Sequence, residues 1–274
     1  MKKLSLTLAT LSILVASWAS AGSTLPEPCI KSTLCSGLLE VYSLDQVSDD
    51  ASRFGAFMGQ LYEPVGVNIG TAVGMFGNAV DLTGTATSYL WANGGGGLPT
   101  TTGFWMRADT FPANGNSHYI LSRSDTTRPG PYVILTTDGA GTHVQIAFFS
   151  VDNSANVSVT SGVITVSAWH YIAVGTGIAK DASGVPIGAA PFVSIDGAAK
   201  TYGATIGFTP HPGSWQFRIG TGFSGAGPDS GGTATQSYDG RLDQLAFWGR
   251  ELTNSEISLI YNAGAGRAYP FVTE

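Results

Sequence analysis

Short segments in which apolar and polar residues alternate recur along most of the chain. Gly, Asn and Asp separate these segments, and β-branched and aromatic residues are common inside them, so the pattern predicts β-strands. The predicted strands are 38–45, 89–91, 118–123, 132–136, 143–150, 157–161, 169–175, 191–195, 215–219 and 242–248. A helical period occurs only near the C-terminus. The pattern therefore predicts an all-β protein, an antiparallel two-sheet jelly-roll sandwich with one short C-terminal helix.

The last predicted strand is apolar at successive positions, which indicates that both of its faces are covered. A turn at Asp239–Gly240 is expected to precede it, because Gly accepts a positive φ without steric cost. Alternation assigns its side chains to two faces: Leu242, Ala246 and Trp248 on one, and Leu245 and Phe247 on the other.

The helix that follows has clear start and stop signals. Thr253 is a good N-cap, and Glu256 stands at the capping-box spacing from it. Leu252 and Ile257 occupy the positions of a hydrophobic staple, and Gly264 is expected to close the helix in the left-handed conformation. A helix of about ten residues is marginal alone in water, so this one is expected to pack against a sheet.

The same closing segment carries a longer ordered motif, D-G-x-[IL]-D-x-[LV]-x-[FI]-[WY]-x-R-x-L-[ST]-x-x-E-[IL]-x-x-[LI]-Y-N-x-G. The residues that match it are Asp239, Gly240, Asp243, Trp248, Arg250, Leu252, Thr253, Glu256, Tyr261, Asn262 and Gly264. With this motif the chain resembles the laminin-G-like, concanavalin A-like jelly-roll domains of secreted and surface proteins. That fold is used by lectins, adhesion modules, hydrolases and structural domains, so the resemblance implies a fold and no single activity.

Other segments match the family in the expected order, from about residue 37 to 271. The opening strand 37–45 matches the family's first strand at Gly37, Leu38, Tyr42, Leu44 and Asp45, 77–82 matches the second strand, and 104–108 matches an [FA]-W-[VM] strand. The stretch 49–74 is interpreted as a long polar connection before a strand that crosses to another part of the sandwich. One departure is 180–190, an insertion-like stretch that contains more Gly and Ala than a plain hairpin needs.

The N-terminus has the three parts of a secretory signal peptide. Lys2 and Lys3 precede an apolar run over 4–18, and the small residues 19–21 form the cleavage site. We therefore predict a signal peptide over 1–21, an N-terminal arm over 22–36 and the jelly-roll domain over 37–274. An uncleaved anchor or an ordered apolar arm is the alternative. The prediction implies a secreted, extracellular or cell-surface protein with no membrane span after cleavage.

Composition excludes two classes of partner. Only 12% of residues are charged, and removal of 1–21 takes the formal charge from -6 to -8, because two lysines are lost. An acidic chain of this kind offers no basic surface for nucleic acid or for anionic lipids.

Cys29 and Cys35 are the only cysteines, and they lie close together in the predicted arm. In an exported chain this spacing predicts a local disulfide between them. Two free thiols are the alternative. A zinc site is disfavoured, since no second cysteine pair and no nearby histidine is present.

Residues for catalysis are not in the required patterns. Cleavage of glycans needs two carboxylates close together, and no Glu has an acidic residue two or four positions away within a predicted strand. The histidines lie far apart, and no serine stands in the G-x-S-x-G form of a nucleophile elbow. The sequence therefore predicts that the protein is not an enzyme.

The resemblance raises one possible cofactor, a structural Ca²⁺. Many members of the superfamily hold such an ion where the first and last strands meet, and Asp45 and Asp243 match acidic positions of those strands. Calcium prefers carboxylate and backbone oxygens. The alternative is that both aspartates only accept hydrogen bonds from backbone N–H groups.

No ligand-binding residues can be assigned from the sequence. Trp91, Trp105 and Trp215 lie near predicted loops and could stack on sugars, but burial is the favoured interpretation for each. The predicted function is an exported, non-enzymatic recognition or surface-attachment domain that binds a glycan or another surface polymer. Low charge and many Gly, Ser and Thr suit an alternative, a structural subunit of an extracellular filament or of a virion or cell-surface assembly, with copies of itself as partners.

Overall fold

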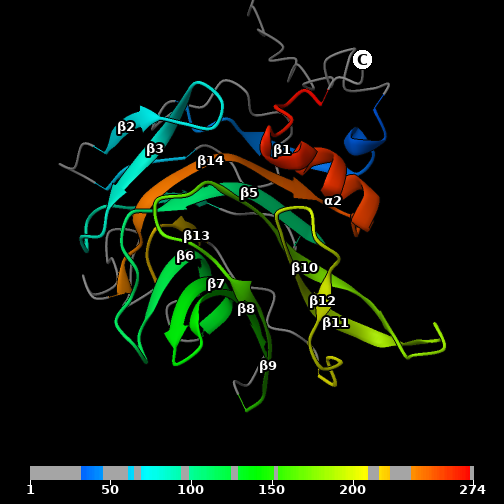
Figure 1. Ribbon diagram of the computed structural model, residues 1–274. Helices are drawn as coiled ribbons and strands as arrows, with labels where there is room; N and C mark the ends of the chain where they lie inside the picture. The colour runs from blue at the N-terminus through cyan, green and yellow to red at the C-terminus, as the bar shows by residue number, and fades with distance from the viewer. Residues whose placement is uncertain are drawn as a thin grey trace, which may run out of the picture.

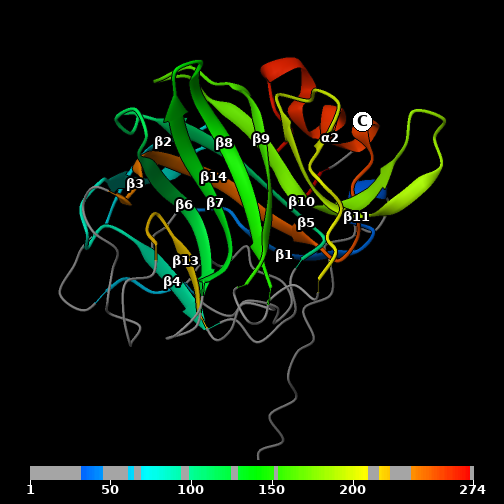
Figure 2. The same ribbon diagram turned by 90° about the horizontal axis from the view of Figure 1, so that it is seen from below.

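The computed structural model describes residues 32–45, 61–64, 69–93, 99–124, 129–150, 154–208, 216–222 and 236–271. The predicted signal peptide, Cys29 and Trp215 lie outside these ranges. The described residues form two antiparallel sheets packed face to face, with one short α-helix on the outer side of the larger sheet (Figures 1 and 2). This arrangement confirms the predicted all-β sandwich with a C-terminal helix.

The larger sheet has eight strands in the order β12-β11-β10-β5-β14-β3-β2, with β1 added beside β14. Its strands are β1 (Leu38–Tyr42), β2 (Gly70–Val73), β3 (Asn78–Thr83), β5 (Thr101–Ala108), β10 (His170–Lys180), β11 (Pro186–Ile195), β12 (Thr201–Tyr202) and β14 (Asp239–Trp248). The first and last described strands therefore lie side by side, as the jelly-roll prediction requires.

The smaller sheet has six strands in the order β4-β13-β6-β7-β8-β9. Its strands are β4 (Leu90–Asn93), β6 (Ser117–Ser124), β7 (Pro129–Asp138), β8 (Gly141–Phe149), β9 (Asn156–Val163) and β13 (Gln216–Ile219). The remaining described elements are α2 (Asn254–Tyr261) and two 3-10 turns, η1 (Thr33–Cys35) and η3 (Asn262–Gly264).

Two apolar clusters stabilise the fold, one on each face of the larger sheet. The core between the sheets includes Phe104 of β5, and the cluster beneath α2 includes the next residue, Trp105. Successive strand residues point to opposite faces, so the strands in the middle of the larger sheet, such as β5, β10 and β14, contribute to both clusters. Trp248 and Ile257 belong to the cluster beneath α2 and are fully buried. This double coverage explains why the strands that cross the middle of the larger sheet are apolar at consecutive positions.

A β-bulge in β14 overturns the predicted assignment of its faces. Gln244 has a φ of 49°, and the register with β5 shifts around it. Leu242 therefore faces the core between the sheets together with Leu245, whereas Ala246 and Trp248 face α2. The prediction that Leu242 shares a face with Ala246 and Trp248 was wrong, because the extra residue reverses the alternation.

The predicted turn at Asp239–Gly240 was also wrong, since both residues belong to β14. Gly240 has a φ of 146°, and a Cβ at this position would lie 2.2 Å from the carbonyl oxygen of Arg107. Glycine is needed here for a close approach of two strands rather than for a turn.

The helix begins as predicted and ends differently. Thr253 and Glu256 form the capping box, with each side chain bonded to the other's backbone N–H. Asn262 adopts the left-handed conformation at the C-cap, with a φ of 49°, two residues before the predicted Gly264. Asn is the residue after Gly that most readily adopts this conformation. The two staple residues, Leu252 and Ile257, are both buried.

Two predicted connections contain strands. The stretch 49–74 includes β2, which pairs with β3 and is largely exposed. A short exposed strand buries little apolar surface, so it leaves no alternating pattern in the sequence. The insertion-like stretch 180–190 is the tip of a long hairpin formed by β10 and β11, which projects from the sandwich (Figure 2).

Candidate functional site

Asp45 and Asp243, the predicted metal ligands, meet at the turn between β2 and β3. Asp243 Oδ2 accepts a hydrogen bond of 2.8 Å from the N–H of Phe76, and Asp45 Oδ1 accepts one of 2.8 Å from the N–H of Asn78. A Cβ on Gly77 would lie 2.7 Å from Asp45 Oδ1, so glycine lets this carboxylate reach the turn. The structure thus brings together two residues that are far apart in the sequence.

The electrostatics of this pair favour a positive partner. Asp243 is completely buried, and its burial, with a smaller contribution from the charge of Asp45, raises the pKa of its carboxyl to about 7. Its Oδ1 has no hydrogen-bond partner, and neither carboxylate forms an ion pair with a Lys or Arg within the described residues. A buried carboxylate without a compensating charge is costly when ionised.

The donor set fits Ca²⁺ only in part. Within the ranges that the structure describes, no three Asp, Glu, His or Cys side chains gather closely enough to hold a metal ion. Carbonyl oxygens or water would therefore have to complete the six to eight ligands, roughly, that calcium takes. The backbone N–H bonds of Asp45 and Asp243 match the alternative interpretation, and the partnerless Oδ1 is the observation that leaves room for a cation.

The aromatic candidates divide between the core and the surface. Trp105 is buried beneath α2, where it stacks on Tyr261 with ring centroids 6.0 Å apart. Trp91 is half-buried and packs on Tyr62 at 4.9 Å. Trp215 lies outside the described residues. Burial of Trp105 is confirmed, and of the two described candidates Trp91 is the one that is partly exposed.

The structure describes one of the two predicted disulfide partners, Cys35. Cys35 is disulfide-bonded and buried beside the C-terminal segment. Its Sγ lies 3.8 Å from the carbonyl oxygen of Pro270. The predicted partner Cys29 lies outside the described residues, so the pairing itself stays a prediction.

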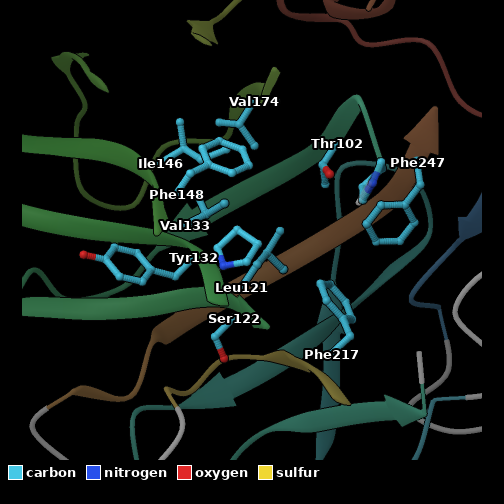
Figure 3. Close-up of a pocket in the computed structure, with 13 residues that line it drawn as sticks. Thr102, Leu121, Ser122, Tyr132, Val133, Ile146, Phe148, Val174, Phe217 and Phe247 are labelled. Carbon is cyan, nitrogen blue, oxygen red and sulfur yellow. The ribbon is translucent and has the colours of Figure 1, made fainter. Parts of the chain in front are cut away.

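A small slot opens between the two sheets at one end of the sandwich (Figure 3). Its volume is about 50 Å³, and most of the side chains around it are apolar. The residues that line it are Pro99, Thr102, Leu121, Ser122, Pro131, Tyr132, Val133, Ile146, Phe148, Val174, Gly175, Phe217 and Phe247. Pockets for drug-sized ligands measure roughly 300–1,000 Å³, so this slot cannot enclose a sugar ring.

A larger and more open groove lies between α2 and the turn that follows β11. Its volume is about 590 Å³, and amide, hydroxyl and small apolar groups line it without any charged side chain. The residues that line it are Gly197, Ala199, Asn254, Ser255, Ser258, Leu259, Asn262 and Ala263. The backbone N–H of Lys200 donates to Asn254 Oδ1 at 3.2 Å, and Asn262 Nδ2 donates to the carbonyl oxygen of Gly266 at 3.1 Å.

The conformation of the turn at Asp196 and Gly197 forms one wall of this groove. Asp196 has a φ of 52° in the turn, and its carboxylate accepts from the N–H of Tyr171 at 2.9 Å and contacts His170 Nδ1 at 2.7 Å. Gly197 follows with a φ of 73°, and a Cβ there would lie 2.8 Å from the ring of Tyr261. The absence of that Cβ lets the turn lie close to α2 and forms one wall of the groove.

Sequence reasoning did not identify the groove. Its lining residues are short polar and small apolar side chains on the exposed side of α2 and in one turn, which is the usual composition of a surface. Only Asn262 belongs to the closing motif. The one available signal is the polar side of the predicted helix, and that signal is shared by most surface helices.

No model of a known protein family matches the chain, and no curated protein matches it. Solved structures do match. The binding domain of Paraclostridial Mosquitocidal Protein 1 superposes with a TM-score of 0.62 at 14% identity, over 84% of this chain and 53% of that one. The receptor binding domain of botulinum neurotoxin type G gives a TM-score of 0.57 at 13% identity, over 83% and 51%. This chain therefore spans about half the length of both toxin domains.

A third similar structure is a complex. Domain 4 of AbnA, a GH43 extracellular arabinanase from Geobacillus stearothermophilus, was solved with arabinotriose and superposes with a TM-score of 0.53 at 18% identity, over 81% of this chain and 96% of that one. These similarities confirm the β-sandwich class that the resemblance implied. The narrower laminin-G-like assignment stays a prediction.

Proposed function

We propose that the protein is an exported recognition domain that binds a neutral glycan in the groove between α2 and the turn after β11. The observation that carries this proposal is the lining of the groove, which offers amides and hydroxyls and no charge. Sugar hydroxyls both donate and accept hydrogen bonds, as Asn and Ser side chains do. An open groove also suits one stretch of a longer polymer.

The similar structures support a binding role. Two of them are named as toxin binding domains, and the third was solved with an arabinose oligosaccharide. Their low identity to this chain means that they support a β-sandwich used for binding, and the choice of a neutral glycan rests on the groove itself.

Two acidic residues near α2, Glu251 and Glu256, are held by other side chains, which fits a non-enzymatic role. Glu251 Oε1 accepts hydrogen bonds from Lys200 Nζ and Tyr202, and Glu256 accepts from Arg250 NH2 at 2.6 Å. Burial by itself would raise the pKa of Glu251, but these bonds lower it. An acid that donates a proton to a leaving group needs a raised pKa, so Glu251 is unsuited to that role.

We also propose export to the cell surface or the extracellular space, after cleavage of 1–21, with Cys29 and Cys35 paired in the arm. The signal-peptide pattern and the disulfide at Cys35 support this proposal. None of the helices that the structure describes is long and apolar enough to cross a membrane.

One structural Ca²⁺ at Asp45 and Asp243 completes the proposal. When bound, the ion would neutralise the two carboxylates that hold the β2–β3 turn. The support is the buried Oδ1 of Asp243 without a partner and the like charge of Asp45 beside it.

A glycan array tests the proposed function. The purified protein is expected to bind a subset of neutral glycans. Excess chelator is expected to lower its melting temperature and to leave its glycan preference largely unchanged. An array without any bound glycan, in both the presence and the absence of calcium, would contradict the proposal.

A second candidate function, self-assembly, is favoured by the hairpin of β10 and β11. Ile178 continues the face of β10 that forms the inter-sheet core, yet it is 50% exposed, because the larger sheet extends beyond the smaller one. Val185 and Ile187 at the tip are 55% and 56% exposed. The opposite charges of Lys180 and Asp181 leave the tip with no net charge, so the tips of two copies do not repel each other.

Analytical ultracentrifugation separates the two candidates. Assembly through the hairpin predicts a concentration-dependent oligomer that Ile187→Lys abolishes, while glycan binding is retained. A monomer at high concentration would rule out this second candidate.

A further inference from the structure

The slot between the sheets lies where several strand ends meet. Thr102 is near the start of β5, Phe247 near the end of β14, and Pro131 near the start of β7. Antiparallel pairing sets Thr102 opposite Phe247 in the larger sheet, and the slot extends from there to the start of β7 in the smaller sheet. The slot is therefore a gap between the sheets near these strand ends; its lining side chains are drawn in Figure 3.

The walls of the slot are apolar side chains from both sheets. Val133 and Ile146 come from the smaller sheet, and Val174 and Phe247 come from the larger one. All of them are almost completely buried. Atoms that line an unfilled apolar gap lose dispersion contacts, so an apolar group that enters gains them.

One polar group is available at the slot. The hydroxyl of Thr102 has no hydrogen-bond partner among the described residues, whereas the hydroxyl of Ser122 already donates to the carbonyl oxygen of Thr221 at 2.8 Å. A ligand that combines a small apolar end with one carbonyl oxygen would use both features of the slot.

Size selects the ligand further. An apolar cavity of about 150 Å³ holds a benzene molecule, and this slot is about 50 Å³. It therefore admits a group of a few heavy atoms and excludes a ring. We propose that the slot binds a short acyl group, such as the acetyl group of an acetylated sugar, with Thr102 donating to the acyl carbonyl. This inference rests on the proposed glycan function. The groove lies on the other face of the larger sheet, so the slot would be a second contact site for the same class of polymer.

Methyl-resolved NMR of the full chain can test the proposal, because the slot and the groove contain different methyl groups. Leu121, Val133, Ile146 and Val174 report on the slot, and Leu259 reports on the groove. The probes are N-acetylglucosamine and glucose, which differ at the acetamido group. The N-acetylated sugar is expected to move the four slot signals and to bind about tenfold more tightly than glucose.

The outcomes separate this proposal from the function on which it rests. If N-acetylglucosamine moves the Leu259 signals and leaves the slot signals unchanged, the slot proposal is wrong and the groove stands. If glucose moves the slot signals equally, the acyl group is not what the slot recognises. If neither sugar moves any of these signals at millimolar concentration, both proposals are contradicted for these sugars.

Two variants test the role of the hydroxyl and of the free volume in the slot. Thr102→Val removes the hydroxyl with little change in volume and is expected to weaken binding of the N-acetylated sugar about fivefold. Val174→Phe fills the slot and is expected to abolish the shifts of its remaining methyl signals. Thr71→Val, on the exposed strand β2, is the matched control and should bind as the parent does. Equal affinity of Thr102→Val and the parent would overturn the role of the hydroxyl.

Discussion

The two sides of α2 show how differently structure and recognition are encoded in this chain. The inner side places Ile257 and Ile260 on a cluster that includes Trp248, whose Nε1 donates to the carbonyl oxygen of Leu34. The outer side places Ser255 and Ser258 along an open groove. The closing motif that makes the chain recognisable describes the inner side, so a strong resemblance can specify the fold and leave the ligand unspecified.

Arg250 bonds the start of α2 to the N-terminal turn η1. Its guanidinium donates to the carbonyl oxygens of Ser36 and Thr33, at 2.6 and 2.9 Å, and to both carboxylate oxygens of Glu256. Its aliphatic stem packs on Gly37. One side chain thus ties the first described turn to the last helix, and it was predicted only as a motif position.

The largest expected effect comes from Trp248, at the centre of the inner side. It is fully buried, and its Nε1 donates to the carbonyl oxygen of Leu34 at 2.7 Å. Trp248→Ala is expected to lower the free energy of unfolding by about 3–5 kcal/mol, measured by urea titration. Trp91→Ala is the control, because that ring is half-buried and its Nε1 has no partner in the described part of the chain. An equal loss of unfolding free energy in both variants would contradict the claim that the cluster beneath α2 contributes more to stability than the region around Trp91.

The next effect concerns pH and the buried Asp243. Burial raises the pKa of this carboxyl from 3.8 in an unfolded chain to about 7 in the folded protein, so folding favours the protonated form. Without calcium, the free energy of unfolding is therefore expected to fall as pH rises from about 4 to about 7, by at most about 1.4 kcal/mol per pH unit. Asp243→Asn should remove this slope.

Calcium binding gives a second test of Asp243. The ion binds the ionised carboxylate, so its stabilising effect on the melting temperature is expected to grow as pH rises toward 7. A melting temperature that calcium leaves unchanged at pH 8 would contradict the proposed site while leaving the pH slope intact.

A smaller loss is expected at Arg250. Arg250→Met keeps the aliphatic stem and removes the donors, and should lower the free energy of unfolding by about 2 kcal/mol. The control is Arg241→Met, since Arg241 forms one ion pair with Asp81 at 3.4 Å in a partly exposed position, and exposed pairs contribute about 0–1 kcal/mol. Thermal unfolding of both variants measures the difference.

The smallest effect on stability is expected in the groove. Ser258 is exposed on α2, so Ser258→Arg should change the free energy of unfolding by no more than about 0.5 kcal/mol. A larger loss, measured by the same urea titration, would mean that the outer side of α2 also stabilises the fold.

The fold could be predicted because buried residues recur at the period of the strand or helix that contains them. Alternation identified most strands, and the Thr253–Glu256 capping box identified the start of the helix. What failed were features set by backbone geometry, such as the bulge at Gln244 and the left-handed C-cap at Asn262. A local change in φ at a residue that is not Gly has no signature in hydrophobic periodicity.

The site was harder to predict for a different reason. Asp45 and Asp243 could be paired because both stand at motif positions of strands that lie at the two ends of the domain. The groove depends on a turn at Gly197 that approaches Tyr261 from a distant part of the chain. Such an approach depends on tertiary packing, which a single sequence does not display.

Isothermal titration of the best glycan from the array against two arginine variants tests the central claim most directly. Ser258→Arg fills the groove, and Ser183→Arg places the same charge on the exposed tip of the β10–β11 hairpin. The account predicts that Ser258→Arg loses the glycan while Ser183→Arg binds it with the affinity of the parent. Equal affinity of both variants for the glycan would contradict the groove as the recognition site.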